Sequence, residues 1–305
     1  MEKTWTKLTV HGKKANLDTI CAIVSMIDEG LLIEDCSDLK VNEMYGDLID
    51  ESVLSADPDK ISVSIFIDGS QNPLDSIAFL KDRFSSSNMT VKIECEGIRE
   101  EDWAETWKKY YHPVKIEKIT VVPAWEEYIP SEGEIIVKMD PGMAFGTGTH
   151  ETTRLVIRML EREVVPGERV LDIGTGSGIL AICASKLGAG YCGAYDIDPD
   201  AVKVAEENIK KDGDTNIVCG ISDLLSGVDI SGGKFNLVVA NIVADIILRL
   251  LPDLSDYMTD DGRAILSGII DPRLAEIKEA ALKYGFSVES ELHENDWCAL
   301  LVKKG

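Results

Sequence analysis

The sequence predicts an α/β protein built on a doubly wound, mostly parallel sheet with an antiparallel last strand, preceded by a smaller α+β domain. Two observations lead to this prediction. At Val170–Leu180 an apolar strand runs into a glycine-rich turn and an apolar helix, as in doubly wound sheets. Near the end, the predicted strands Phe286–Leu292 and Cys298–Val302 are joined by a turn too short for a parallel crossover. The last strand is therefore expected to run antiparallel.

The glycine turn predicts a cofactor site. Gly174, Gly176 and Gly178 stand at alternate positions after a strand that ends at Asp172. Glycines there allow a sharp turn and expose bare main chain to a ligand. The helix that follows offers unpaired N–H groups and a partial positive charge. The dinucleotide fingerprint places its third glycine where this chain has Ile179, so a nicotinamide cofactor is disfavoured. The spacing, together with Asp172, resembles the first motif of S-adenosylmethionine methyltransferases.

A second acid is expected at the same cofactor. Asp196 follows the predicted strand Ala189–Tyr195, about 20 residues after the glycine turn, where a ribose-binding carboxylate is expected. Nicotinamide enzymes use the same device, so Asp196 predicts an adenosyl cofactor without specifying which one. Asp198 precedes Pro199 and the predicted helix Ala201–Lys210, and it is expected to cap that helix.

An asparagine is the candidate catalytic residue. Phe235–Asn241 has the composition of a buried strand that ends in an amide. Because doubly wound sheets bind ligands at the carboxyl ends of their strands, Asn241 is expected to face the same crevice as Gly174 and Asp196. Its amide oxygen can accept a hydrogen bond from an amine and orient the amine lone pair. Asp245, in the first turn of the next helix, is expected to interact with the helix dipole.

The segment Asp140–Thr153 is rich in glycine and threonine and leads into the predicted helix Thr152–Glu163. Such a loop can wrap a ligand and donate several hydrogen bonds. We expect it to form a lid over the methionine end of the cofactor. It contains His150, which is the alternative to Asn241 as the group that handles the amine, acting as a general base.

Four segments resemble the ribosomal protein L11 methyltransferase family: Glu101–Pro113, Asp140–Thr153, Leu171–Leu180 and Val239–Ile242. The resemblance covers essentially the whole chain. It implies the class I methyltransferase fold and transfer of methyl groups from S-adenosylmethionine to amino groups of a large-subunit ribosomal protein. It also implies an N-terminal domain that recognises this substrate.

Carried over by position, the family's cofactor contacts fall on Thr153, Gly174, Asp196 and Asn241, and Gly176 and Gly178 complete the predicted cofactor site. The chain departs from the family at Glu151, where a proline is expected between the histidine and the threonine pair. An acidic residue is also favourable at a helix start, so activity is expected to remain.

The N-terminal region is expected to form a separate domain. Its strands and helices follow the order βαββαβ, the ferredoxin-like pattern, over Thr4–His11, Ala15–Asp28, Leu31–Asp35, Ile61–Ile67, Pro73–Phe84 and Met89–Cys95. An acidic insertion at Asn42–Asp59 interrupts the pattern. The predicted organisation is a recognition domain over 1–98, a linker helix over 99–113 and a methyltransferase domain over 114–305.

The linker helix carries Trp103, Trp107 and Tyr110 on one face. This face is either a packing stripe against one domain or a hinge that positions the recognition domain. The methyltransferase domain is expected to begin with strands Lys115–Val122 and Glu134–Met139, and its later part to include strand Gly262–Gly268 and helix Arg273–Tyr284.

Composition narrows the class of protein. The seven cysteines of the 305 residues include no Cys-x-x-Cys pair, and the four histidines stand at no ligand spacing, so neither disulfides nor a metal site are expected. No apolar stretch approaches the roughly 20 residues of a membrane span, and the N-terminus is not a signal peptide. From these observations we expect a cytoplasmic protein. We also expect a monomer.

The net charge of −23 disfavours nucleic acid as a partner, because phosphate backbones are recognised by basic surfaces. It favours a basic protein substrate, although an acidic surface also simply maintains solubility. Three alternatives stay open: a class I methyltransferase acting on another protein, a small molecule or RNA; a non-catalytic ribosome-associated binding module; and a nicotinamide oxidoreductase. The sequence leaves undecided which amines are modified and how many methyl groups each receives.

Overall fold

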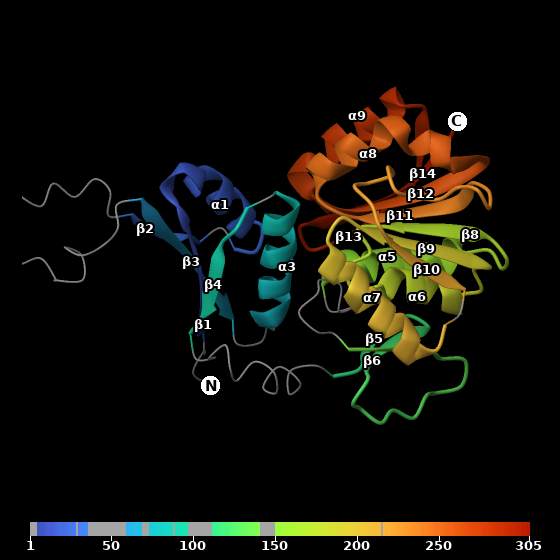
Figure 1. The fold of residues 1–305 in the computed structure, drawn as a ribbon, viewed down its shortest axis with the longest axis horizontal. Coiled ribbons are helices and arrows are strands. Elements are labelled where there is room, and N and C mark those ends of the chain that lie inside the picture. Colours follow the sequence, from blue (N-terminus) through green and yellow to red (C-terminus); the bar gives the residue numbers. More distant parts are fainter. Residues whose placement is uncertain are drawn as a thin grey trace, which may run out of the picture. The chain divides into compact units, whose positions relative to one another are not determined.

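The computed structural model of the chain forms two compact units, Met1–Tyr110 and Tyr111–Gly305 (Figure 1). The described residues are 5–28, 30–35, 59–68, 73–87, 89–96, 112–140, 150–214 and 216–305. The predicted acidic insertion up to residue 58, the linker helix up to residue 111 and the lid residues 141–149 lie outside them. No helix in the described ranges combines the length and apolar character of a membrane span.

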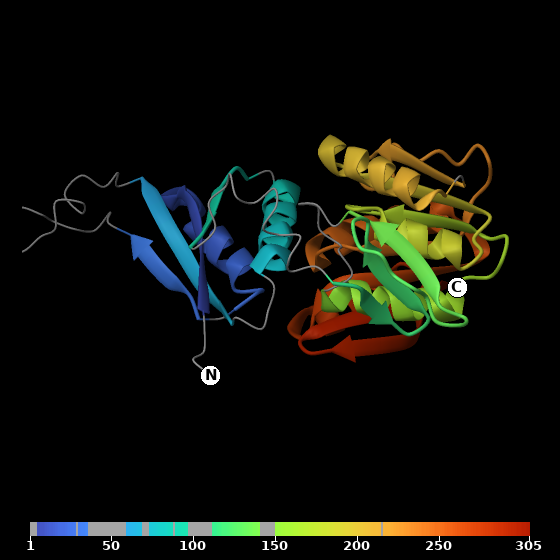
Figure 2. The ribbon, with the colours of Figure 1, turned by 90° about the horizontal axis from the view of Figure 1, so that it is seen from below.

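The first unit is a four-stranded antiparallel sheet in the order β2-β3-β1-β4, with the described helices α1 and α3 on one of its faces (Figure 2). Alternate residues of β3, such as Ile61, Val63 and Ile65, are buried, as expected for a sheet covered on one side. The elements are β1 Trp5–Lys13, η1 Lys14–Asn16, α1 Leu17–Val24, β2 Leu32–Asp35, β3 Lys60–Asp68, α3 Pro73–Ser86 and β4 Lys92–Cys95.

The second unit is built on a seven-stranded sheet in the order β10-β9-β8-β11-β12-β14-β13. Strand β14 runs antiparallel to both β12 and β13, and the other described pairs are parallel, which confirms the predicted antiparallel last strand. The strands are β8 Arg169–Ile173, β9 Tyr191–Asp196, β10 Ile217–Ile221, β11 Phe235–Asn241, β12 Met258–Ile270, β13 Phe286–Glu294 and β14 Trp297–Lys304.

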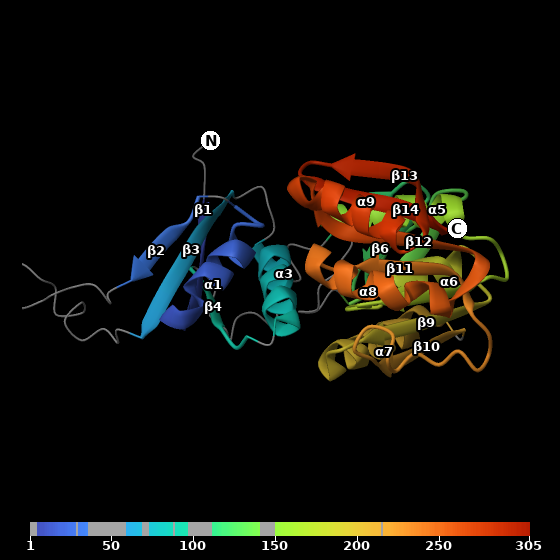
Figure 3. The same ribbon diagram turned by 90° about the horizontal axis from the view of Figure 1, so that it is seen from above.

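Helices cover both faces of this sheet (Figures 1 and 3). One layer holds α5 Glu151–Glu163, α6 Ile179–Lys186 and α7 Pro199–Asp212. The other holds α8 Ala244–Tyr257 and, after the short turn η3 Asp271–Arg273, α9 Leu274–Lys283. The central strands are buried on both sides; in β11, Leu237 to Ala240 are each fully buried. This continuous burial is the reason that parallel strands have uninterrupted apolar runs.

One predicted strand is wrong. The expected strand Lys115–Val122 is a hairpin of β5 Val114–Ile116 and β6 Ile119–Pro123, and β6 pairs in parallel with β7 Ile135–Met139. Glu117 turns the chain with a φ of +52°. The amides of Lys118 and Ile119 then donate to Oε1 of Glu161, at 2.9 and 3.2 Å. A carboxylate from a helix distant in sequence fixes this turn, so local periodicity could not reveal it.

Strand β10 was not predicted, although it pairs along its whole length with β9. It lies at the edge of the sheet and has only partial burial, so it lacks the apolar run that marks the central strands. The predicted cap is confirmed: Asp198 accepts a hydrogen bond from the amide of Asp200 at 2.9 Å, with Pro199 in the first turn of α7.

Candidate active site

Strand register brings three of the predicted site residues to one edge of the sheet. Ile173 of β8 pairs with Tyr195 on one side and with Ala240 on the other. The next residue in each strand is Gly174, Asp196 or Asn241, so these three stand side by side at the carboxyl ends of adjacent strands. This is the position at which doubly wound sheets bind ligands.

All three glycines of the turn adopt the left-handed backbone, with φ of +71° at Gly174, +53° at Gly176 and +83° at Gly178. Side chains rarely adopt this conformation. Space is also limited: a Cβ at Gly178 would lie 3.1 Å from the Cβ of Ala205 in α7. The third glycine therefore permits close packing of α6 on α7, while the first two shape the turn itself.

The carboxylate of Asp196 is held in place by backbone amides. Its Oδ2 accepts from Gly176 N–H at 2.9 Å, and its Oδ1 accepts from Asp198 N–H at 3.0 Å. The side chain is mostly buried. Each carboxylate oxygen can accept more than one hydrogen bond, so a fixed Asp196 remains suited to bind vicinal hydroxyls.

Asp172 lies behind the glycine turn and is fully buried. Its Oδ2 accepts a hydrogen bond from the hydroxyl of Thr175 at 2.6 Å, whereas its Oδ1 has no partner within the described part of the chain. Burial, with a smaller contribution from the charge of Asp196, raises the pKa of Asp172 to about 7. The sequence singled out this acid but contained no signal of its altered protonation.

The side chain of Asn241 has an unpaired acceptor. The residue is almost fully buried, and its Oδ1 has no hydrogen-bond partner among the described residues. A buried amide oxygen without a partner costs about 1–3 kcal/mol, and such groups usually mark a ligand or another functional demand. The end of β11 therefore presents an acceptor that is ready for a donor from a bound molecule.

The backbone after Asn241 lies between two glycines: Gly174, which the sequence singled out, and Gly268, which it did not. A Cβ at Gly174 would lie 2.5 Å from Cγ2 of Ile242, and a Cβ at Gly268 would lie 2.3 Å from the Ile242 carbonyl oxygen. The Ile242 amide also donates to the Ser267 carbonyl at 3.0 Å. The contact at Gly268 is with main-chain atoms of Ile242, so only glycine fits there without a shift of the backbone next to Asn241.

The start of α5 lies beside the same edge. The hydroxyl of Ser267, which pairs in register with Asn241, donates to the Thr152 carbonyl at 3.4 Å. The next residue, Thr153, is fully buried, and its hydroxyl has no partner in the described ranges. The structure thus brings Thr153 close to the end of β12, next to the strand that carries Asn241.

His150 caps helix α5. Its Nδ1 accepts from the Thr152 amide at 3.3 Å and lies 2.9 Å from the Thr152 hydroxyl. Its ring lies edge-on to Trp297, with centroids 5.1 Å apart. Because the amide bond requires Nδ1 to accept, the neutral ring carries its proton on Nε2. Glu151 begins the helix and forms an ion pair with Arg154 at 3.2 Å, so an acid is accommodated at this position.

Comparison with known proteins identifies the family. The family model described as Ribosomal protein L11 methyltransferase (PrmA) matches residues 4–305. The chain belongs to this family. A relative from Caldanaerobacter subterraneus named ribosomal protein L11 methyltransferase is 43% identical over 310 residues, which cover 98% of this chain and 99% of the relative. One of the same name from Streptococcus pyogenes is 38% identical and covers 99% of this chain and 96% of the relative.

A solved structure supports the same family. The ribosomal protein L11 methylase of Lactobacillus delbrueckii subsp. bulgaricus superposes with a TM-score of 0.60 at 39% identity, covering 64% of this chain and 100% of that one. The fold is accordingly that of a class I methyltransferase with a mixed sheet. As a member of the ribosomal protein L11 methyltransferase family, the chain is an S-adenosylmethionine-dependent methyltransferase, as the motif analysis predicted.

Proposed function

We propose that this chain methylates amino groups of ribosomal protein L11, on lysine side chains, the N-terminal α-amine or both. The names of relatives that match almost the full chain support this substrate, and so does the net charge of −23, which favours encounter with a basic protein. The observation that carries the proposal is the buried Oδ1 of Asn241 at the sheet edge, which has no hydrogen-bond partner among the described residues, because that atom suits an amine donor.

The residues at the sheet edge fit S-adenosylmethionine. The glycine turn 174–178 provides a concave backbone for the adenosyl part, and Asp196 is placed to accept hydrogen bonds from both ribose hydroxyls. The Thr153 hydroxyl, buried and unpaired in the described ranges, would bond the methionine portion. We assign cofactor binding to Thr153, Gly174, Gly176, Gly178, Asp196 and Asn241, in agreement with the positions carried over from the family.

The cofactor supplies an activated methyl group, which leaves its sulfur with the C–S electron pair staying behind. The protein must hold a neutral amine in line with that methyl group. Asn241 Oδ1 accepts an N–H of the amine and thereby directs its lone pair. Holding the reactants in this geometry lowers the barrier by several kcal/mol. The buried edge also favours the neutral amine, because desolvation lowers an amine pKa.

His150 is the weaker candidate for handling the amine proton. Its Nδ1 accepts the helix-capping amide, so using this atom as a base would disrupt the start of α5. Asn241 has no comparable structural bond at Oδ1 among the described residues. We therefore assign orientation of the amine to Asn241 and assign His150 to the helix start.

We propose that residues 1–98 form a ferredoxin-like domain that recognises the substrate, that 99–113 form a linker and that 114–305 form the methyltransferase domain. The order βαββαβ and the antiparallel strand order β2-β3-β1-β4 support the first assignment. We further propose that the protein acts as a cytoplasmic monomer without binding nucleic acid directly. Free thiols at all six described cysteines agree with a reducing compartment.

The test is methylation of purified ribosomal protein L11, read by mass spectrometry, with S-adenosylmethionine affinity measured by calorimetry. Asn241→Ala should lower kcat at saturating S-adenosylmethionine by about 100-fold, the scale expected when a reactant is misplaced, which exceeds the loss of cofactor affinity of about 10-fold that one hydrogen bond accounts for. Asn236→Ala is the control on the same strand, because Asn236 bonds the Arg169 amide at the other end of β11.

Near-normal turnover of Asn241→Ala would show that the amide does not orient the amine. Label entering ribosomal RNA or an unrelated protein, with none in ribosomal protein L11, would refute the substrate assignment.

A further inference from the structure

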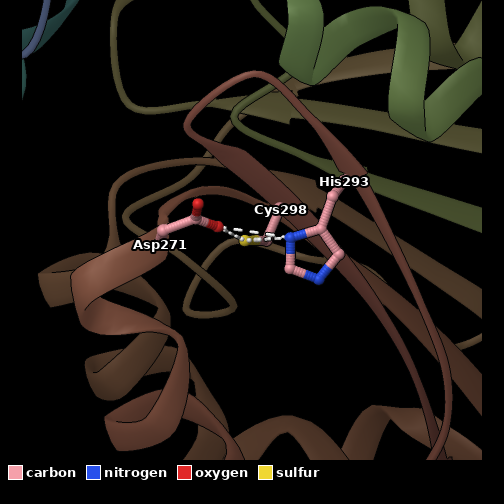
Figure 4. A group of neighbouring side chains, drawn as sticks. All are labelled: Asp271, His293 and Cys298. Carbon is pink, nitrogen blue, oxygen red and sulfur yellow. Dashed lines mark hydrogen bonds and ion pairs between the residues drawn. The ribbon is translucent and has the colours of Figure 1, made fainter.

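A second cluster of chemically reactive side chains lies where η3 meets the last two strands. Asp271 begins η3, His293 lies near the end of β13, and Cys298 lies at the start of β14 (Figure 4). One potential ligand atom from each of them lies within 4.8 Å of the others. It is the one such group of three found in the described ranges. The proposed methyl transfer uses none of these three residues.

We propose that Asp271, His293 and Cys298 form a zinc-binding site. A thiolate, an imidazole and a carboxylate are all common zinc ligands, whereas magnesium and calcium avoid sulfur. Three protein ligands leave a fourth position for water. The donor set thus selects a borderline-soft divalent cation.

The distances suit a tetrahedral ion. With zinc bonds of about 2.3 Å to sulfur and 2.0–2.2 Å to nitrogen and oxygen, neighbouring donors are roughly 3.3–3.6 Å apart. His293 Nδ1 lies 3.3 Å from Cys298 Sγ and 3.2 Å from Asp271 Oδ1. Cys298 Sγ and Asp271 Oδ1 are closer, at 2.7 Å, because the thiol donates to the carboxylate. Zinc would replace the thiol proton, and the distance between Cys298 Sγ and Asp271 Oδ1 would then lengthen. The half-exposed side chain of Asp271 can move to allow this.

An outer carboxylate is present as well. Nε2 of His293, the nitrogen that faces away from the cluster, lies 3.7 Å from Oε1 of Glu291. Histidines that bind metals through one nitrogen usually offer the other to a carboxylate or a carbonyl, which fixes the ring and strengthens the bond. Lys278 forms an ion pair with Glu291 and so holds this acid in place.

A reactive cysteine would be the competing interpretation. Reactive cysteines are partly exposed and lie in electropositive surroundings. Cys298 is instead buried and hydrogen-bonds to the carboxylate of Asp271. The geometry therefore disfavours a nucleophile, whereas the thiol, the imidazole and the carboxylate together can act as metal ligands.

A bound zinc ion would stabilise the part of the second unit that lies beside the candidate active site. It would tie the end of β12 to the β13–β14 hairpin, which contacts α5 through Glu294. That carboxylate binds Arg154 Nε at 2.7 Å and Arg158 at 2.6 Å. Helix α5 carries Thr153 near its start. Zinc is thus expected to raise the thermal stability of the second unit.

The test is titration of the full-length, reduced, metal-free protein with Co²⁺, which reports thiolate ligation by a charge-transfer band in the near ultraviolet, and then displacement by Zn²⁺. The wild type should develop the band with one ion per chain. Cys298→Ser, which keeps a hydroxyl donor for Asp271, should lose the band and bind Zn²⁺ at least about 10-fold more weakly. Cys219→Ser is the matched control, because Cys219 is a free thiol on the distant strand β10.

Zn²⁺ should raise the unfolding temperature of the wild type and of Cys219→Ser but not that of Cys298→Ser. If Cys298→Ser does not fold, Asp271→Asn provides the second variant and should weaken Zn²⁺ binding. The proposal is overturned if the wild type gives no thiolate band, if the band persists in Cys298→Ser, or if it disappears only in Cys219→Ser.

Discussion

Gly268→Ala tests whether the glycine at the end of β12 fixes the backbone that carries Asn241. Gly268 has a φ of +84°. A Cβ there would lie 2.3 Å from the Ile242 carbonyl oxygen, 2.8 Å from its carbon and 3.1 Å from its nitrogen. These are backbone atoms, so no side-chain rotation relieves the contact. Gly285→Ala is the matched control, because Gly285 has a φ of +83° and no atom within 4 Å of the added Cβ.

The two substitutions share the cost of a left-handed alanine, about 1–2 kcal/mol. Gly268→Ala adds overpacking against rigid main chain, which typically costs about 1–3 kcal/mol. We therefore expect a loss of about 1–2 kcal/mol in the free energy of unfolding for Gly285→Ala and about 2–5 kcal/mol for Gly268→Ala. Methyl transfer should fall in Gly268→Ala alone, since Ile242 and Asn241 must shift together.

Urea unfolding of the three full-length proteins, followed by tryptophan fluorescence, measures the difference. Trp297 of β14 lies in the same sheet and reports on the second unit. Equal destabilisation by the two substitutions, with equal activity, would show that the contact with Ile242 carries no energetic weight and that the left-handed backbone alone accounts for the glycine.

Two further substitutions test the cofactor contact of Thr153 and the protonation of Asp172. Thr153→Val removes a buried hydroxyl that has no partner in the described ranges, so the free energy of unfolding should stay the same or rise. The affinity for S-adenosylmethionine, measured by calorimetry, should fall about 3–10-fold, which corresponds to one hydrogen bond. Unchanged affinity would show that Thr153 does not bind the cofactor. Asp172 has a pKa of about 7 against an ordinary 3.8, so the folded state retains a proton that the unfolded chain releases. Its contribution to stability therefore decreases as pH rises from about 4 to about 7, and Asp172→Asn should flatten that decrease in urea unfolding measured across this range.

The part of the site that follows from local sequence was predictable. The glycine turn, Asp196 and Asn241 each follow an apolar strand, and parallel strands end at one edge of a sheet, so their proximity could be expected before the register of Ile173 showed it. The roles of these residues in binding the cofactor and the substrate remain predictions.

The remaining features depend on contacts between distant residues. Gly268 is needed because an added Cβ would lie 2.3 Å from the carbonyl oxygen of Ile242, the residue that follows β11. The turn at Glu117 depends on Glu161, more than forty residues away. His293 stands at no ligand spacing in the chain, yet the hairpin brings it to Cys298 and η3 brings Asp271 to both. Residue spacing along a sequence carries none of this information.

The position of β14 has a consequence for how the protein is synthesised. Among the strands of the seven-stranded sheet, β14 comes last in the chain, yet it lies between β12 and β13. While the nascent chain is shorter than Trp297, β12 has an unpaired edge and β13 has no partner, and unpaired edges attract other chains. The first unit completes its sheet from residues already made. The methyltransferase sheet is complete only when β14 has inserted between β12 and β13, so closure of this sheet is a late step of folding.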